Sequence, residues 1–95
     1  MNELSFNRNE KQFTFNQIKG CICELNIGEL FCNVTLSVGH EIVRQVNLVM
    51  KRYQYDELVL SCEIGSRISV RFYITSRFKN ERWYTTANFL SFEKD

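Results

Sequence analysis

The stretch that decides the fold reads Arg67-Ile-Ser-Val-Arg-Phe-Tyr-Ile-Thr-Ser-Arg77-Phe-Lys-Asn-Glu-Arg-Trp-Tyr-Thr-Thr86. Its first half alternates polar residues with an apolar row formed by Ile68, Val70, Phe72 and Ile74. A period of two is typical of a β-strand with one buried face. The polar residues 79–81 interrupt this pattern, and a second strand follows over about 82–92. The stretch therefore predicts a β-hairpin that turns at Lys79-Asn-Glu81.

The predicted hairpin carries cations beside aromatic rings. The residues near its tip are Arg77, Phe78, Lys79, Arg82, Trp83 and Tyr84. A flexible single-stranded nucleic acid needs cations for its phosphates and flat rings for its unstacked bases. The hairpin is therefore a candidate nucleic-acid surface, although an ordinary solubilising hairpin tip would carry similar charges. Because neighbouring residues of a strand face opposite ways, we expect one of the two adjacent rings, Trp83 or Tyr84, to enter the core.

The same alternation continues upstream. It predicts strands over about 16–25, from Leu30 to Val38 and from Ile42 to Met50. It breaks over 53–62, where Asp56 is expected to cap a single helical turn that carries Leu58 and Val59.

The fifth strand is irregular. Thr85, Ala87 and Phe89 share one face, but Leu90 and Phe92 fall on the other. Either a bulge near Asn88 shifts the register, or a second subunit covers the outer face.

Three strands, a helical connection and a two-stranded hairpin within 95 residues predict an all-β protein. The layout matches a five-stranded OB-fold Greek-key barrel with a short helical turn between strands 3 and 4. An SH3-like barrel is the competing choice, and the helical turn and the longer first half favour the OB fold. We expect this domain over 13–95, after a flexible N-terminal segment over 1–12.

The net charge of +1 conceals an uneven distribution. Residues 44–82 carry eight Lys and Arg against four acids, which is +4. A basic middle predicts a polarised surface. A domain of this size buries only about 60–65% of its unfolded surface, so we expect self-association, most simply as a dimer.

A second basic and aromatic cluster follows the third strand, and Arg71 and Tyr73 are expected to face outward from the fourth. The loop after strand three of an OB barrel lies near its binding groove. The predicted nucleic-acid-binding residues are therefore Arg44, Lys51, Arg52, Tyr53, Arg71, Tyr73, Arg77, Phe78, Lys79, Arg82 and Trp83.

No catalytic or metal motif is evident, and we expect neither enzyme activity nor a cofactor. His40 is the only histidine, and the four cysteines contain no Cys-x-x-Cys pair, so we expect buried reduced thiols rather than metal ligands. No apolar run approaches the ~20 residues of a membrane span. The first residues lack the apolar core of a signal peptide, so a cytoplasmic protein is expected.

Two segments resemble bacterial single-stranded DNA-binding proteins. Glu63-Ile-Gly-Ser-Arg-Ile-Ser-Val-Arg71 resembles the beginning of their fourth strand, and Arg82-Trp-Tyr-Thr-Thr86 that of their fifth. The likeness covers 63–92 and extends to small primosomal-type and related OB proteins. Ala87-Asn-Phe-Leu90 departs from the family pattern, and the acidic C-terminal tail that recruits partners is missing. The resemblance implies plain strand binding or a primosome-like accessory role.

The expected function is therefore single-stranded DNA binding with little sequence preference, as a replication, repair or recombination accessory protein. Single-stranded RNA is a variant that the sequence does not separate, because stacking and phosphate contacts do not read the sugar. The alternative is an OB-fold assembly module that binds protein without nucleic acid.

Overall fold

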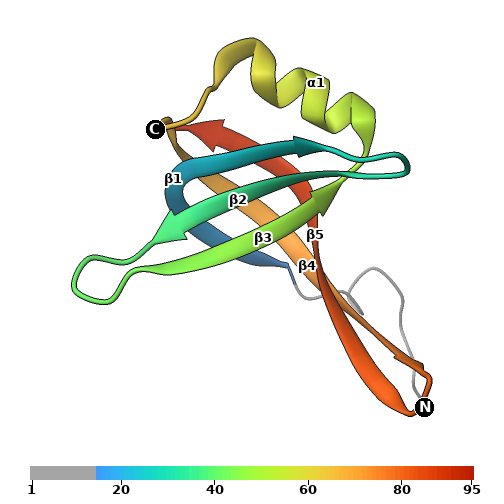
Figure 1. Cartoon of the computed structure of the whole chain (residues 1–95). Coiled ribbons are helices and arrows are strands. Elements are labelled where there is room, and N and C mark those ends of the chain that lie inside the picture. The colour runs from blue at the N-terminus through green and yellow to red at the C-terminus, as the bar shows by residue number, and fades with distance from the viewer. Residues whose placement is uncertain (1–14) are drawn as a thin grey trace, which may run out of the picture.

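Five strands close into a barrel in the computed structural model, which describes residues 15–95 (Figure 1). Around the barrel the strands follow the order β1-β2-β3-β5-β4. The elements are β1 (Asn16–Ile27), β2 (Cys32–Val38), β3 (Arg44–Met50), α1 (Arg52–Ser61), β4 (Arg67–Lys79) and β5 (Arg82–Lys94). A closed five-stranded barrel with one helix between β3 and β4 confirms the predicted OB fold. The expected flexible segment 1–12 and the first two residues of the expected domain lie outside the described residues.

Strand β1 closes the barrel because it pairs with two neighbours. Its first half pairs with β4 and its second half with β2, and Cys21 belongs to both ladders. At the bend, a Cβ atom on Gly20 would lie 2.6 Å from the carbonyl oxygen of Ser37, so only glycine permits this approach. A register shift between Ile22 and Glu24 leaves Cys23 as an extra residue, and such a bulge adds curvature.

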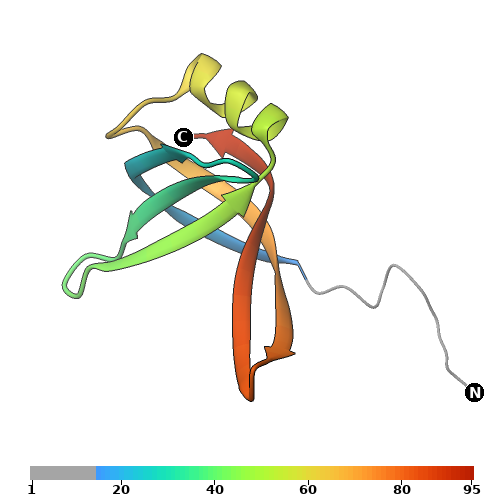
Figure 2. The same cartoon turned by 45° about the vertical axis from the view of Figure 1, so that its right-hand side comes forward.

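The core lies inside the barrel and beneath α1. Alternate residues of the strands fill it, and Leu58 of α1 is fully buried against them. Figures 1 and 2 show α1 lying across one end of the barrel. The most deeply buried side chains are Ile22, Cys32, Val34, Leu36, Leu48, Leu58, Ile68 and Val70.

The helical connection is longer than predicted. It spans ten residues rather than a single turn, and Asp56 lies in its middle instead of capping it. The Gln54 side chain reaches back instead: its Oε1 accepts a hydrogen bond from the Lys51 backbone N–H at 2.8 Å. Asp56 forms an ion pair with Arg52, one turn earlier.

The irregular fifth strand contains the predicted bulge. Arg71 pairs with Ser91 and Phe72 with Phe89, so Leu90 is the extra residue on β5. Phe89 and Phe92 can then both pack on the core, with ring centroids 6.2 Å apart. The bulge accounts for the side-chain pattern without a covering subunit.

Three details of the predicted strands were wrong. Leu30 and Ile42 were expected at the beginning of strands, yet they lie in loops and are 85% and 67% exposed. The Gly28 N–H donates to the Phe31 carbonyl at 2.9 Å and closes the first of these loops, so β2 begins later. Buried thiols were expected, but only Cys32 and Cys62 are buried; the bulge exposes Cys23, and Cys21 is half-buried.

Beyond the barrel, β4 and β5 continue as a projecting two-stranded ribbon (Figures 1 and 2). The ribbon turns at Asn80 and Glu81, whose φ angles are 52° and 62°. Two consecutive positive φ angles are those of a type I′ hairpin turn, which matches the twist of the strands. Strand β5 meets β3 at a single ladder position, Val49 opposite Asn88.

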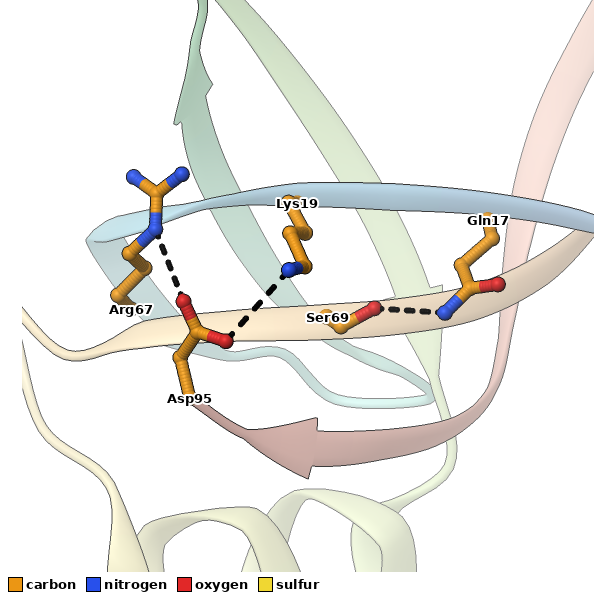
Figure 3. A network of polar contacts seen from close by, with 5 residues as sticks. All are labelled: Gln17, Lys19, Arg67, Ser69 and Asp95. Carbon is orange, nitrogen blue, oxygen red and sulfur yellow. Dashed lines mark hydrogen bonds and ion pairs between the residues drawn. The ribbon is translucent and has the colours of Figure 1, made fainter.

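At the other end of the β4–β5 ladder, polar contacts hold three strands together (Figure 3). Asp95 lies 3.0 Å from Arg67 Nε and 3.7 Å from Lys19 Nζ, and the Asp95 N–H donates to the Arg67 carbonyl at 3.0 Å. Gln17 Nε2 donates to Ser69 Oγ at 2.8 Å. We call the contacts among Lys19, Arg67 and Asp95 the clasp. Within residues 15–95, no helix is long and apolar enough to cross a membrane.

Candidate nucleic-acid interface

The projecting hairpin has two chemically different faces. Residues that oppose one another in an antiparallel ladder share a face. Arg77 opposes Tyr84 and Lys79 opposes Arg82, so these four residues share what we call the basic face. Phe78 opposes Trp83 on the other side, which we call the aromatic face. The alternation of the strands therefore places three cations and Tyr84 on one face, and Phe78 and Trp83 on the other.

A cleft of about 570 Å³ lies beside the basic face. Arg77, Lys79 and Tyr84 line it from the hairpin, and Phe31 and Val49 line it from the barrel.

A second hollow, of about 210 Å³, adjoins this cleft. Lys51, Tyr53 and Tyr73 are among its lining residues. The two hollows share Phe31, Val49 and Asn88. We refer to them together as the trough. It brings the two separate basic and aromatic clusters of the sequence to one surface.

The cations in and beside the trough are not neutralised by the part of the chain that the structure describes. Within 15–95, Lys51, Arg77, Lys79 and Arg82 form no ion pair with an acid. Like charges close together without anions create a positive potential that attracts polyanions.

Arg52, by contrast, is already paired. Its Nε lies 2.9 Å from Asp56 Oδ1, and this hydrogen bond, together with the charge of the carboxylate, raises the pKa of the guanidinium. Its charge is therefore partly offset by an acid on its own helix.

Asn88, which lines both hollows of the trough, forms hydrogen bonds within the protein. Asn88 Nδ2 lies within hydrogen-bonding distance of three acceptors: Thr75 Oγ1 at 3.0 Å, Thr86 O at 3.2 Å and Tyr73 O at 3.3 Å. An amide nitrogen carries only two hydrogens, so the protein itself occupies the donors of this side chain. The Asn88 side chain is therefore fixed by internal bonds and offers no free amide donor to read a base.

The structure gathers some of the predicted site residues and separates others. Lys51, Tyr53, Tyr73, Arg77 and Lys79 line the trough, and Arg82 lies beside them on the basic face.

Five predicted residues lie elsewhere. Arg44 begins β3, about 17 Å along the strand from Val49 of the trough, and Arg52 is in its ion pair on α1. The Arg71 guanidinium lies 5.6 Å from the centroid of the Phe15 ring. Phe78 and Trp83 occupy the aromatic face.

Most of the residues that line the trough were not among the predicted site residues; they include Phe31, Val49, Tyr84 and Asn88. Tyr84 could have been predicted from the sequence, because it is two residues after Arg82 and a strand with a period of two places both residues on one face. Phe31 could not be predicted in this way, because its position depends on the conformation of the loop before β2.

Trp83 and Tyr84 were expected to divide between core and solvent. Instead they are 69% and 45% exposed, because the ribbon extends past the barrel and neither of its faces meets the core. The expectation that one ring is buried was wrong.

Among residues 15–95, no group of three or more His, Cys, Asp or Glu side chains could hold a metal ion.

No protein-family model and no curated protein matches the chain. Solved structures do match. The mitochondrial single-stranded DNA-binding protein Rim1 from S. cerevisiae has a TM-score of 0.74 and 10% identity, over 86% of this chain and 95% of that one. The chain has an OB fold in common with it.

Two further solved structures have a similar fold. The N-terminal domain of the PriB protein from Thermoanaerobacter tencongensis, described as dimeric, has a TM-score of 0.64 and 17% identity, over 85% of this chain and 94% of that one. The small single-stranded DNA-binding protein from Streptomyces coelicolor has a TM-score of 0.60 and 12% identity, over 87% and 94% respectively. At these identities the likeness establishes the fold.

Proposed function

We propose that this protein binds single-stranded DNA with little sequence preference and that the strand lies in the trough. The observation that carries the proposal is the meeting of two basic and aromatic clusters. Lys51 and Tyr53 border one of the adjoining hollows, and Arg77, Lys79 and Tyr84 border the other. The sequence separates these clusters by more than twenty residues, and only the barrel unites them.

Each class of side chain has its own role in this proposal. Lys51, Arg77, Lys79 and Arg82 contact phosphates and release counterions, so affinity falls as salt rises. Tyr53 and Phe31 are exposed, and together with Tyr84 they offer ring faces to successive bases. Stacking accepts every base, since every base has a π-face.

The internal bonding of Asn88 supports a weak sequence preference. Reading a base requires free donors and acceptors aimed at its edge. The donors of Asn88 are directed at Thr75, Thr86 and Tyr73 instead. The amide hydrogens of Asn88 therefore do not select a base, and stacking accepts every base.

The comparisons support this role. Rim1 and the Streptomyces coelicolor protein are described as single-stranded DNA-binding proteins, and PriB as a dimer. We propose a dimeric binding protein without enzyme activity that assists replication, repair or recombination. A cytoplasmic location stays a prediction.

Fluorescence anisotropy of a labelled, unstructured DNA oligonucleotide tests the proposal at two salt concentrations. We expect saturable binding that weakens with salt, and a salt slope that falls by about 0.7 in Arg77→Ala. Arg44→Ala is the matched control, since Arg44 is exposed but distant from the trough. Absence of binding at micromolar protein and low salt, or equal losses in the two variants, would contradict the proposal. An RNA oligonucleotide of the same sequence measures the preference for DNA.

The alternative, a module that binds only protein, loses part of its motivation. It rested on apolar residues on both faces of the third and fifth strands. The bulge at Leu90 lets Phe92 pack against the core, so that side chain does not need a partner subunit.

A further inference from the structure

The aromatic face of the hairpin has no part in the proposed trough. Phe78 and Trp83 are a cross-strand pair with ring centroids 5.2 Å apart, and they are 58% and 69% exposed. Neither residue lines the trough, because the strand period turns both away from Arg77 and Tyr84. Two exposed rings at the end of a projecting ribbon require a separate explanation.

The surrounding charges indicate the kind of molecule that covers these rings. Arg77, Lys79 and Arg82 flank them along the strands, against a single acid, Glu81. The tip therefore carries three positive charges and one negative, a net +2. A second copy placed tip against tip would bring the same positive charge, which like-charge repulsion opposes. A polyanion with flat rings, a nucleic acid, complements both the charge and the aromatic surface.

The position of the ring pair indicates which part of a nucleic acid covers it. The two rings are inclined at 62° to one another as an edge-to-face pair, and both are exposed. A strand in the trough lies on the opposite face of the hairpin and leaves them uncovered, whereas the end of an adjoining duplex offers them a flat apolar surface.

Resting on the proposed function, we propose that the protein binds where a single strand leaves a duplex. The last base pair packs against Phe78 and Trp83. One strand of the duplex continues past the edge of β5 onto the basic face and into the trough. No further strand pairs with that edge along the projecting ribbon, since the β3–β5 ladder consists of the single position Val49 opposite Asn88. The substrate class is thus a tailed duplex or fork.

Three DNA molecules test the proposal: a tail alone, a blunt duplex, and the same duplex carrying that tail. We expect the tailed duplex to bind about tenfold more tightly than the tail alone, which is within the range for one stacking contact. A tailed duplex with abasic sites in place of its last base pair keeps the phosphates and should lose this preference. A 2-aminopurine in that last pair should change its fluorescence on binding.

Variants on the two faces of the hairpin separate the contributions. Trp83→Ala should abolish the preference for the tailed duplex and change affinity for the tail by less than about twofold, and Trp83→Phe should keep the preference. Tyr84→Ala, its neighbour on the basic face, should weaken binding to both molecules equally.

Equal wild-type affinities for the tail and the tailed duplex would overturn the junction proposal. An equal loss of both in Trp83→Ala would also overturn it and place a base of the single strand on the ring pair. Failure of the tail alone to bind would instead refute the proposed function, so the two failures are distinguishable.

Discussion

The two ends of the β4–β5 ladder use their charges in opposite ways. At the barrel end, the clasp places Arg67 and Lys19 on one carboxylate, that of Asp95 (Figure 3). At the hairpin end, Arg77, Lys79 and Arg82 have no acid partner within residues 15–95. Cations that hold strands together are neutralised by the protein, whereas those on the hairpin remain available to a ligand.

Burial differs between the ends in the same way. The barrel end is covered by α1 and encloses the core residues Ile68 and Val70. The hairpin exposes Phe78, Trp83 and Tyr84, which would be costly surfaces without a function. We therefore expect substitutions at the barrel end to change stability and those on the hairpin to change binding.

The largest effect is expected from Leu58→Ala. Leu58 is fully buried and joins α1 to the barrel, so its truncation removes apolar contacts and leaves a cavity. We expect a loss of about 2–5 kcal/mol in the free energy of unfolding. Urea denaturation followed by circular dichroism measures it. Leu60→Ala, on the same helix but exposed, is the control and should cost less than about 0.5 kcal/mol.

The double variant Arg77→Ala/Lys79→Ala should weaken DNA binding strongly and change stability little. Loss of two phosphate contacts lowers the salt slope of binding by about 1.4 and weakens low-salt affinity by roughly tenfold or more. Because both side chains are exposed, the free energy of unfolding should change by less than about 0.5 kcal/mol. If this variant unfolds more readily but binds DNA normally, the hairpin cations serve stability rather than DNA binding.

Glu81→Gly should stabilise the hairpin and also raise its affinity for DNA. Glu81 has a φ of 62°, a strained conformation for a residue with a side chain, and glycine relieves about 1 kcal/mol of that strain. Amide hydrogen exchange of the ribbon should slow, and DNA affinity should rise as an acid is lost. Glu81→Gln separates the two effects, because it removes the charge and keeps the strain. Faster exchange in Glu81→Gly would show that the Glu81 side chain stabilises the turn.

The smallest effect is expected from Asp95→Asn. This change weakens the clasp, whose partners are partly exposed, and should cost about 0.2–1 kcal/mol of stability. Affinity for DNA should not fall, since Arg67 and Lys19 lie at the far end of the ladder. Thermal unfolding and anisotropy on the same sample measure both quantities. A marked loss of DNA binding would place the ligand at the clasp.

Much of the fold could be predicted because its strands are amphipathic. Alternation identified β4 and the hairpin. The apolar residues on both faces of β5 indicated either a bulge or a covering subunit, and the structure has the bulge. The length of α1 could not be predicted in this way. Its first turn depends on the contact of Gln54 with the Lys51 backbone, and Asp56 resembled a cap although it pairs with Arg52.

The trough was harder to predict than the strands. Its cations could be identified by type, but its shape depends on Phe31, Val49 and Asn88 meeting, and these residues are far apart in the sequence. The division of the hairpin into two faces follows from strand period alone. The sequence did not show which cations are neutralised, because the ion pairs of Arg67 with Asp95 and of Arg52 with Asp56 form only in the folded chain.

The most direct test of the account is a titration of the isotope-labelled protein with an unstructured single-stranded DNA oligonucleotide, followed by amide chemical shifts. We predict that the largest changes cluster at Lys51, Tyr53, Arg77, Lys79 and Tyr84, while Lys19, Arg67 and Asp95 keep their positions. Changes centred on the clasp, or on the exposed side of α1 at Leu60, would contradict the assignment of the trough as the DNA-binding surface.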